Sequence, residues 1–123
     1  DIPFARLLEP QLPTTQVIRR GEGTKVVAGE ANYEAILLAA CPPGARRDVY
    51  LLMTQPGADR ISQPHPPGSV EHIIVTQGRA LVGLLDAAEE LGAGDYICYP
   101  ADQPHIFKAL EPDTYALLVA EQN

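Results

Sequence analysis

Proline and glycine recur at short intervals along the whole sequence, and this spacing restricts the possible folds more than any other feature. The chain of 123 residues contains 12 prolines and 10 glycines. The segments between them are short and rich in Val, Ile, Leu and Tyr. Short apolar segments bounded by turn-forming residues are typical of β-strands joined by tight turns. The sequence therefore predicts an all-β protein, built as a sandwich or a barrel.

The apolar segments define the strands that we expect. The prolines fall in the connections or at strand ends, where a missing N–H group costs little. The stretch LGAGD (91–95) marks a tight turn that depends on the backbone freedom of glycine. A turn of helix within residues 3–11 would end at Pro10. The expected strands are Thr15–Arg20, Thr24–Ala28, Tyr33–Ala40, Val49–Gln55, Val70–Gln77, Ala80–Leu85, Ala87–Leu91, Tyr96–Pro100, Ile106–Ala109 and Thr114–Ala120.

The length of the chain suits one domain. Hydrophobic residues make up 46% of it, and no apolar run approaches the roughly 18 residues of a membrane-spanning helix. No charged segment followed by an apolar one opens the chain, so no signal peptide is indicated. We expect residues 1–16 to be an arm or linker and residues 17–123 to form the domain. Because the chain starts with Asp1 and its only methionine is Met53, we also expect a piece of a longer protein.

The formal net charge of −7 argues against nucleic-acid binding by this chain itself, because such binding needs a basic surface. An acidic balance agrees better with a cationic ligand. The two cysteines, Cys41 and Cys98, show neither CxxC nor zinc-finger spacing. We therefore expect reduced, semi-buried thiols in a cytoplasmic protein that does not contact a membrane. The alternative is a disulfide between the two cysteines.

The stretch HPPGSVEHIIVTQG, residues 65–78, places a carboxylate inside an apolar strand. Alternation along this strand puts Glu71 on one face with Ile73 and Val75, and His72 on the opposite face. A buried carboxylate usually shifts its pKa, finds a partner or binds a metal, because an isolated buried charge is costly. The alternative is that Glu71 lies at the end of the strand, beside solvent. We expect a structural or interfacial role for His72.

A second stretch, GDYICYPADQPH, residues 94–105, delivers a histidine after a strand and a short loop. His105 would be an ordinary surface residue unless its strand lies beside the one that carries Glu71. The sequence leaves open which side chains of this region face a pocket. The two possible sets are Tyr96, Cys98 and Phe107, or Ile97 and Tyr99.

These two stretches resemble the two motifs of the cupin family. The first motif, G-x5-H-x-H-x3,4-E-x6-G, is matched by His65, Glu71 and Gly78, while Pro67 takes the place of the second histidine. The second motif, G-x5-P-x-G-x2-H-x3-N, is matched at its first Gly, its Pro and its His. Those positions are Gly94, Pro100 and His105, with Asp102 in place of the second Gly and Ala109 in place of the Asn. The resemblance spans residues 49–121 and implies a small jelly-roll barrel with a site in its interior.

In cupins, two histidines and a glutamate of the first motif and one histidine of the second bind a metal. Carried over by position, the resemblance implies the ligands His65, Glu71 and His105, with one ligand lost at Pro67. Such a set resembles non-haem iron sites with open coordination positions, and imidazole also suits zinc and nickel. The implied cofactor is one divalent transition metal: Fe, Zn, Ni or Mn. The alternative is a metal-free cupin in which the same three side chains bind an organic ligand directly.

The two stretches are also similar to a narrower group, the C-terminal cupin domain of bacterial regulators that begin with an Xre-type helix-turn-helix. The segments HPPGSVEH and GDYICYPADQPHIF carry this likeness. It implies a domain that senses a small-molecule effector. We expect the effector site to contain His65, Glu71, His105, Tyr96 and Phe107. It also implies a homodimer whose DNA contact lies in an N-terminal domain outside this sequence.

Effectors of that group vary, and the acidic balance favours an amine with Glu71 as its counter-charge. The alternative function is a stand-alone metal-dependent enzyme of dioxygenase or isomerase type. It would use His65, Glu71 and His105 to activate oxygen or to polarise a carbonyl group. We favour the sensor over the enzyme and therefore assign no catalytic residue from the sequence.

Overall fold

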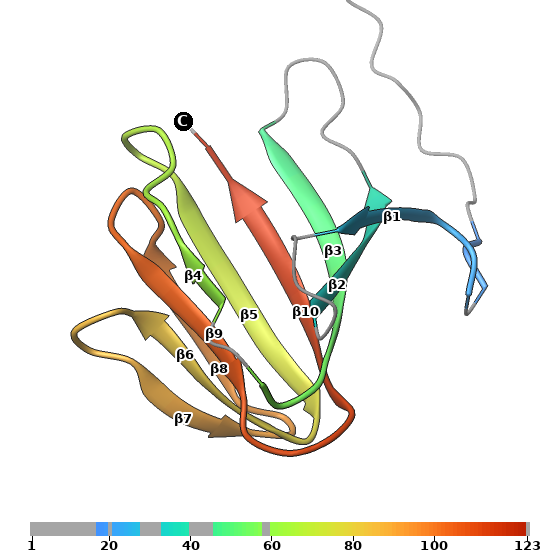
Figure 1. The fold of residues 1–123 in the computed structure, drawn as a ribbon. Helices are drawn as coiled ribbons and strands as arrows, with labels where there is room; N and C mark the ends of the chain where they lie inside the picture. The colour runs from blue at the N-terminus through green and yellow to red at the C-terminus, as the bar shows by residue number, and fades with distance from the viewer. Residues whose placement is uncertain (1–16, 20, 28–32, 40–45, 58–59, 123) are drawn as a thin grey trace, which may run out of the picture.

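The chain folds into two antiparallel β-sheets that pack around one shared core (Figure 1). No helix occurs among the residues that this computed structural model describes, and hence none that could cross a membrane. The described residues are 17–19, 21–27, 33–39, 46–57 and 60–122. The strands are β1 (Thr24–Val27), β2 (Tyr33–Ala39), β3 (Arg47–Thr54), β4 (Arg60–Ser62), β5 (Val70–Gln77), β6 (Arg79–Leu84), β7 (Glu89–Gly92), β8 (Tyr96–Pro100), β9 (His105–Ala109) and β10 (Thr114–Glu121).

The strand order brings distant parts of the sequence side by side. The larger sheet has six strands in the order β1-β2-β3-β10-β5-β8, and the smaller has four in the order β4-β9-β6-β7. All neighbouring pairs are antiparallel. In Figure 1, β10 runs between β3 and β5 in the larger sheet. β5 and β8 are also direct neighbours, so the strands of the two sequence motifs meet.

The predicted all-β class is confirmed, and every strand predicted from residue 24 onward corresponds to an observed one. The prediction for Thr15–Arg20 is wrong where it can be compared, because residues 17–19 form no strand. Strand β4 was missed, since its three residues are too few to show an alternating pattern. It exists because it pairs with β9. The predicted arm, residues 1–16, and the helical turn within it lie outside the described residues.

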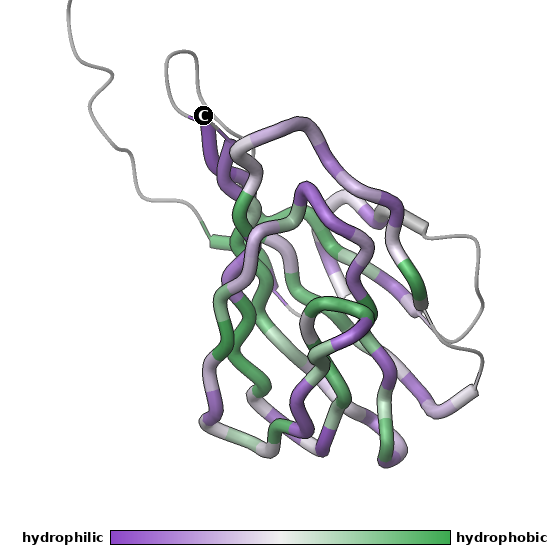
Figure 2. The backbone as a smooth tube through the Cα atoms, turned by 90° about the vertical axis from the view of Figure 1, so that its left-hand side faces the viewer, coloured by the Kyte–Doolittle hydropathy of each residue, from purple (hydrophilic) through white to green (hydrophobic). Residues whose placement is uncertain are grey.

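The core is formed by the inward-facing side chains of both sheets. Figure 2 shows hydrophobic residues concentrated along the strands and hydrophilic ones at many of the connections. In β5, Ile73 and Val75 are almost completely buried, while Ile74 between them is exposed, as the alternation predicted. The other members of the buried cluster are Ala35, Leu52, Ala80, Val82, Tyr99, Ala101, Phe107, Ala116 and Leu118.

The turn after β5 carries the chain from the larger sheet to the smaller one, and its geometry requires glycine. Gly78 has a φ of 82°, a left-handed conformation that is open to glycine at little cost. A Cβ atom here would also lie only 2.9 Å from the Cα atom of Thr114. The Thr114 hydroxyl donates to the Glu111 carbonyl oxygen at 2.8 Å, which fixes the neighbouring loop. Gly78 therefore packs directly against Thr114, the first residue of β10.

Candidate metal and ligand site

Glu71 lies on the inner face of β5, beside the hydrophobic core. Its side chain is only 10% exposed, so the alternative of a solvent-facing strand end does not hold. Across the sheet, Glu71 is paired with Ala120 of β10 and Tyr99 of β8. The strand alternation that buries Ile73 and Val75 therefore also forces this carboxylate into the interior.

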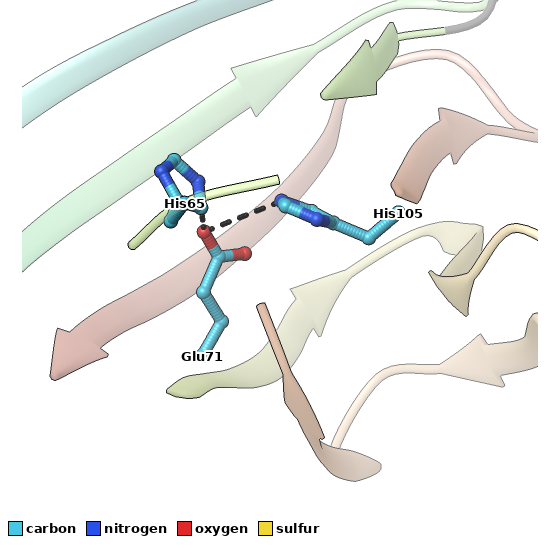
Figure 3. Close-up of side chains that lie close together, drawn as sticks. All are labelled: His65, Glu71 and His105. Carbon is cyan, nitrogen blue, oxygen red and sulfur yellow. Dashed lines mark ion pairs between the residues drawn. The ribbon is translucent and has the colours of Figure 1, made fainter. Parts of the chain in front are cut away.

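The two predicted histidine partners converge on the same oxygen of Glu71. Its Oε2 atom lies 3.2 Å from Nε2 of His65 and 3.5 Å from Nε2 of His105. Figure 3 shows this oxygen pointing toward both imidazole rings. The ring centroids of the two histidines are 5.2 Å apart. The three residues that the sequence motifs singled out thus form one cluster.

The two histidines differ in burial, because one lies in a strand and the other in a connection. His105 is the first residue of β9, where it pairs with Ser62 of β4 and Leu84 of β6, and its side chain is 4% exposed. His65 lies in the connection between β4 and β5, and its side chain is 43% exposed. Its backbone N–H donates to the Ala101 carbonyl oxygen at 2.9 Å, and its ring lies against that of His105, so both its backbone and its ring contact the second motif. His65 therefore forms the solvent-facing side of the cluster.

The loop that carries His65 is shaped by its own sequence, PPGS. The Ser69 hydroxyl and backbone N–H both donate to the carbonyl oxygen of Pro66, at 2.6 Å and 3.1 Å. The backbone N–H of Gly68, a residue with a φ of 85°, donates to the Asp102 carboxylate at 3.1 Å. Asp102 is the residue that replaces the family's glycine in the second motif. Its carboxylate thus joins the two motif loops directly.

Tyr99 contacts the other oxygen of the carboxylate. Its hydroxyl donates to Oε1 of Glu71 at 2.6 Å, and its ring centroid lies 5.4 Å from that of His105. The sequence placed Tyr99 in one of two open sets, and its role depends on the register between β5 and β8. That register is not visible in one sequence, although Tyr99 directly opposes Glu71 once the strands are paired.

The predicted effector residues Tyr96 and Phe107 lie in different places. Tyr96 is on the outer face of β8 and 55% exposed, so the structure does not bring it to the cluster. Its hydroxyl instead lies 2.7 Å from Nδ1 of His72, on the outer face of β5. Phe107 is buried in the interior, where its ring meets Tyr33 edge to face at 6.1 Å.

The outward orientation predicted for His72 is confirmed, and its ring has two partners there. Besides Tyr96, its Nε2 atom lies 2.6 Å from the Glu121 carboxylate. Cys98, the described member of the two cysteines, is free and exposed, so the predicted semi-burial is wrong for it, because it lies opposite His72 on the outer face of β8. Cys41 lies outside the described residues. None of these outer-face groups shares a contact with Glu71 in the structure.

The electrostatics of the cluster favour an ionised Glu71. Burial acts to raise the pKa of this carboxyl group, but hydrogen bonds from His105 and Tyr99 and the charges of both histidines outweigh it, so the pKa is lowered. Burial and the Glu71 charge raise the pKa of Tyr99 far above its usual value. Tyr99 therefore stays protonated and acts as a donor to an anionic carboxylate.

The three side chains fit a divalent metal. One donor atom from each, Nε2 of the histidines and an oxygen of Glu71, can be chosen so that all lie within 4.8 Å of one another. Donor atoms bound about 2.1 Å from one metal are about 3.0 to 3.4 Å apart at octahedral or tetrahedral angles, close to the two Oε2–Nε2 distances. The Gln103 carbonyl oxygen lies 2.8 Å from Nδ1 of His105. Because a carbonyl only accepts, Nδ1 of His105 carries a proton, so Nε2 is the ring nitrogen directed at the cluster. There it would bind a metal after losing the proton that it donates to Glu71 in the metal-free protein.

A cavity of about 210 Å³ opens beside the cluster, with His65 and Glu71 in its wall. Asp48 and Tyr50 of β3 also line it, and sequence reasoning missed both. Burial and the neighbouring Asp48 carboxylate raise the pKa of Tyr50. Alternation along β3 puts these two residues on one face, and the pairing of β3 with β10 turns that face inward. The sequence alone does not reveal this pairing. The remaining lining residues are Ser69, Val70, Ala101, Leu118, Ala120, Glu121 and Gln122.

Two packed antiparallel sheets with a two-histidine, one-carboxylate cluster inside define a jelly-roll barrel with an interior site. The family model of the cupin domain matches residues 50–121, more than half of the sequence. The chain therefore belongs to the cupin family, as its motifs predicted. None of the curated proteins matches the sequence significantly.

Solved structures with the same fold include both regulators and enzyme-like proteins. An HTH_3 family transcriptional regulator from Vibrio cholerae is 22% identical with a TM-score of 0.71, over 75% of this chain and 52% of that one. The cupin domain of an XRE family transcriptional regulator from Enterobacter cloacae is 19% identical with a TM-score of 0.65, over 72% and 94%. A predicted oxalate decarboxylase from Thermotoga maritima is 17% identical with a TM-score of 0.71, over 88% and 100%. This chain thus spans about half the length of the Vibrio regulator.

The lowered pKa of Glu71 predicts how stability depends on pH in metal-free protein. The unfolded carboxyl group has a pKa of about 4.5 and the folded one a lower pKa, so its stabilising contribution is complete above pH 4.5 and is lost as the pH falls through the folded-state pKa. Glu71→Gln removes this contribution, so its unfolding free energy should fall less steeply than that of wild type below pH 4.5. Urea unfolding at a series of pH values measures this, with Glu89→Gln on exposed β7 as the control for one lost charge. Parallel curves for wild type and Glu71→Gln would contradict the assignment.

Proposed function

We propose that this chain is the effector-sensing domain of a cytoplasmic transcriptional regulator, and that it binds a small ligand in the cavity beside His65, Glu71 and His105. The observation that carries the proposal is the combination of a nearly buried polar cluster and an adjoining cavity of about 210 Å³. The cavity has the size of a small metabolite and opens where His65 is exposed to solvent. Binding that differs in strength between two states of an attached DNA-binding domain would shift their populations.

Two solved structures support the regulator assignment. Both the Vibrio cholerae protein and the Enterobacter cloacae domain come from transcriptional regulators and share this fold. The Vibrio chain extends well beyond the part that matches this one. We infer a helix-turn-helix domain in the same protein, outside this sequence, because the acidic charge of −7 does not suit DNA contact by the cupin domain itself.

The cavity favours a cationic ligand. Its lining contains the acidic residues Asp48, Glu71 and Glu121, and no Lys or Arg among the described residues contributes to it. The Glu121 carboxylate already pairs with His72 and Arg47 on the outer side, whereas Asp48 and Glu71 lie on inward-facing positions. Leu118 and Ala120 add an apolar wall. A short primary amine with an aliphatic chain matches this combination of two carboxylates and an apolar surface.

We further propose that His65, Glu71 and His105 hold one divalent transition metal, which would be Fe, Zn, Ni or Mn. The support is the matching donor separation and the contact of Nδ1 of His105 with the Gln103 carbonyl oxygen, which directs Nε2 at the cluster. Proline at position 67 supplies no side-chain ligand, so coordination positions stay open. When bound, the metal would supply a Lewis-acid centre to which a ligand oxygen or nitrogen can attach.

Metal binding is testable by comparing two histidines, because His105 of β9 is buried in the interior and His72 of β5 lies on the outer face. His105→Ala removes an inward donor, and we expect wild-type protein to bind about one equivalent and the variant to bind it far more weakly. His72→Ala, adjacent to Glu71 but on the outer face, is the matched control and should keep wild-type affinity. Calorimetry with Zn²⁺ and elemental analysis of protein purified without a metal-affinity resin give the measurement. Less than a tenth of an equivalent in wild type, not rescued by added Fe, Mn, Zn or Ni, would exclude the metal and leave direct binding of an organic ligand by the three side chains.

The sensing function is tested on the full-length gene product and a DNA fragment from its own promoter region. We expect a helix-turn-helix upstream of Asp1 and a DNA affinity that changes at least several-fold when a short primary amine is added, as typical allosteric couplings do. Carboxylic acids of the same length should have no effect. Asp48→Asn should weaken the response, while Asp86→Asn in the exposed turn after β6 should preserve it. If no DNA-binding domain precedes the cupin domain, the sensor proposal fails.

The second candidate function is a metal-dependent enzyme, of dioxygenase or isomerase type. The specific observation in its favour is the two-histidine, one-carboxylate donor set, which leaves positions for a substrate and a small co-substrate. The likeness to a predicted oxalate decarboxylase also supports the enzyme as a candidate function. Turnover of a small organic acid or carbonyl compound by this domain alone, lost in Glu71→Gln, would favour the enzyme over the sensor.

We also propose a homodimer formed through the outer face of the larger sheet. Ile74 is 40% exposed there, and outward-facing aliphatic residues of β3 and β10 continue the surface. Exposed apolar sheet faces of this kind mark association sites. A hollow of about 440 Å³ lies on the same face, and its apolar lining residues are Ile18, Ile36, Leu38, Leu51, Met53 and Tyr115.

Charge placed on this face should separate the subunits. We expect Ile74→Lys to be a monomer and wild type a dimer by light scattering at tens of micromolar. Leu85→Lys, which changes an exposed aliphatic residue in the turn after β6, is the control and should stay dimeric. A wild-type monomer at that concentration would contradict the dimer, and a dimeric Ile74→Lys would contradict the proposed face.

A further inference from the structure

Tyr99 and the two histidines contact different oxygens of the Glu71 carboxylate. The Tyr99 hydroxyl donates to Oε1 at 2.6 Å, whereas His65 and His105 both face Oε2. The two oxygens of one carboxylate thus have different partners. A carboxylate held in this way has no freedom to rotate about its terminal bond without breaking the short hydrogen bond.

The contact between Tyr99 and Glu71 is built into the fold. The two residues directly oppose each other in the pairing of β5 with β8, and Tyr99 is buried against the core. Burial and the Glu71 charge hold the pKa of the phenol far above its usual value, so its hydroxyl stays protonated and donates to Oε1. The Tyr99 ring also lies against His105, at a centroid distance of 5.4 Å.

We propose that Tyr99 is a positioning residue that restricts Glu71 to binding a metal through Oε2 alone and so keeps the remaining coordination positions open for the effector. This inference rests on the metal-binding part of the proposed function. A carboxylate with both oxygens available can bind a metal through both of them. The second oxygen would then take a position that an incoming ligand needs. Occupation of Oε1 by the phenol prevents this.

The position of the phenol suits this role better than a purely structural one. Phenylalanine would fill the same space in the core and would even avoid burying a polar group. The hydroxyl is stabilising only because Oε1 of Glu71 accepts from it, and Oε1 would otherwise be a buried acceptor without a donor. The chain therefore uses a tyrosine at a core position in order to satisfy and orient one carboxylate oxygen.

The first test compares Tyr99→Phe with Tyr96→Phe. Both substitutions remove one hydroxyl from β8, but Tyr96 lies on the outer face, away from the cluster. We expect Tyr99→Phe to weaken Zn²⁺ binding by about 10-fold or more, as loss of a partner behind a metal ligand typically does. We also expect the visible absorption spectrum of the Co²⁺-loaded protein to change, because the coordination by Glu71 changes. Tyr96→Phe should match wild type in both measurements. Unchanged affinity and spectrum in Tyr99→Phe would overturn the proposal.

A second test does not require a metal and separates this inference from the proposed function. Crystal structures of metal-free wild type and Tyr99→Phe should show one carboxylate orientation in wild type and a rotated or doubled one in the variant. An identical single orientation in both would overturn the positioning role. If wild type binds no metal while the orientations differ, the metal proposal fails and the positioning of Glu71 by Tyr99 stands.

The wild-type protein offers a measurement that does not depend on the variant folding. A buried, hydrogen-bonded phenol proton exchanges slowly with water and is visible by NMR with selectively labelled tyrosine. We expect such a proton on Tyr99, close in space to the side chain of Glu71, with and without metal. Rapid exchange of the Tyr99 hydroxyl proton would show that the hydrogen bond does not persist and would overturn the proposal.

Discussion

The burial of the Glu71 carboxylate is the constraint on which the rest of the site depends. An ionised carboxylate in the interior is tolerated only when its oxygens are hydrogen-bonded, paired with charge or bound to a metal. Here one oxygen accepts from Tyr99 and the other faces His65 and His105. Each of these partners comes from a different part of the chain. The fold must therefore bring together β5, β8, β9 and the loop before β5 to accommodate one acidic side chain.

The fold was largely predictable because its signals are local. Alternation placed Glu71 inward and His72 outward, and turn residues separated the strands from residue 24 onward. β4 escaped prediction because three residues carry no periodicity, and it forms only where β9 offers a partner. The predicted strand at Thr15–Arg20 failed at residues 17–19, where β-branched residues alone do not produce a strand without a pairing neighbour.

The site was predictable where a motif marked it and not where it depends on register. His65, Glu71 and His105 came from motif spacing, and the structure brings their side chains together. Tyr96 was expected in the pocket but faces outward, because one strand shows two faces and only pairing decides which is buried. No sequence motif marked Asp48 and Tyr50 as cavity residues, because nothing in the sequence of β3 indicates that they lie near His65 in the fold. Inter-strand register, rather than composition, selects the lining of the cavity.

Pro67 and Asp102 show how the chain compensates for a site with one ligand fewer than the family motif provides. A fourth ligand would tie the first motif loop to the metal directly. In its absence the loop is shaped by PPGS, in which Ser69 donates twice to Pro66, and it is joined to the second motif by the Gly68–Asp102 hydrogen bond. The same two departures from the family pattern thus act together, because Pro67 removes one side-chain donor from the cluster and Asp102 holds the loop in place. His65 is thus held at its backbone by Ala101 and at its ring by Glu71 and His105, while 43% of its side chain is exposed beside the cavity.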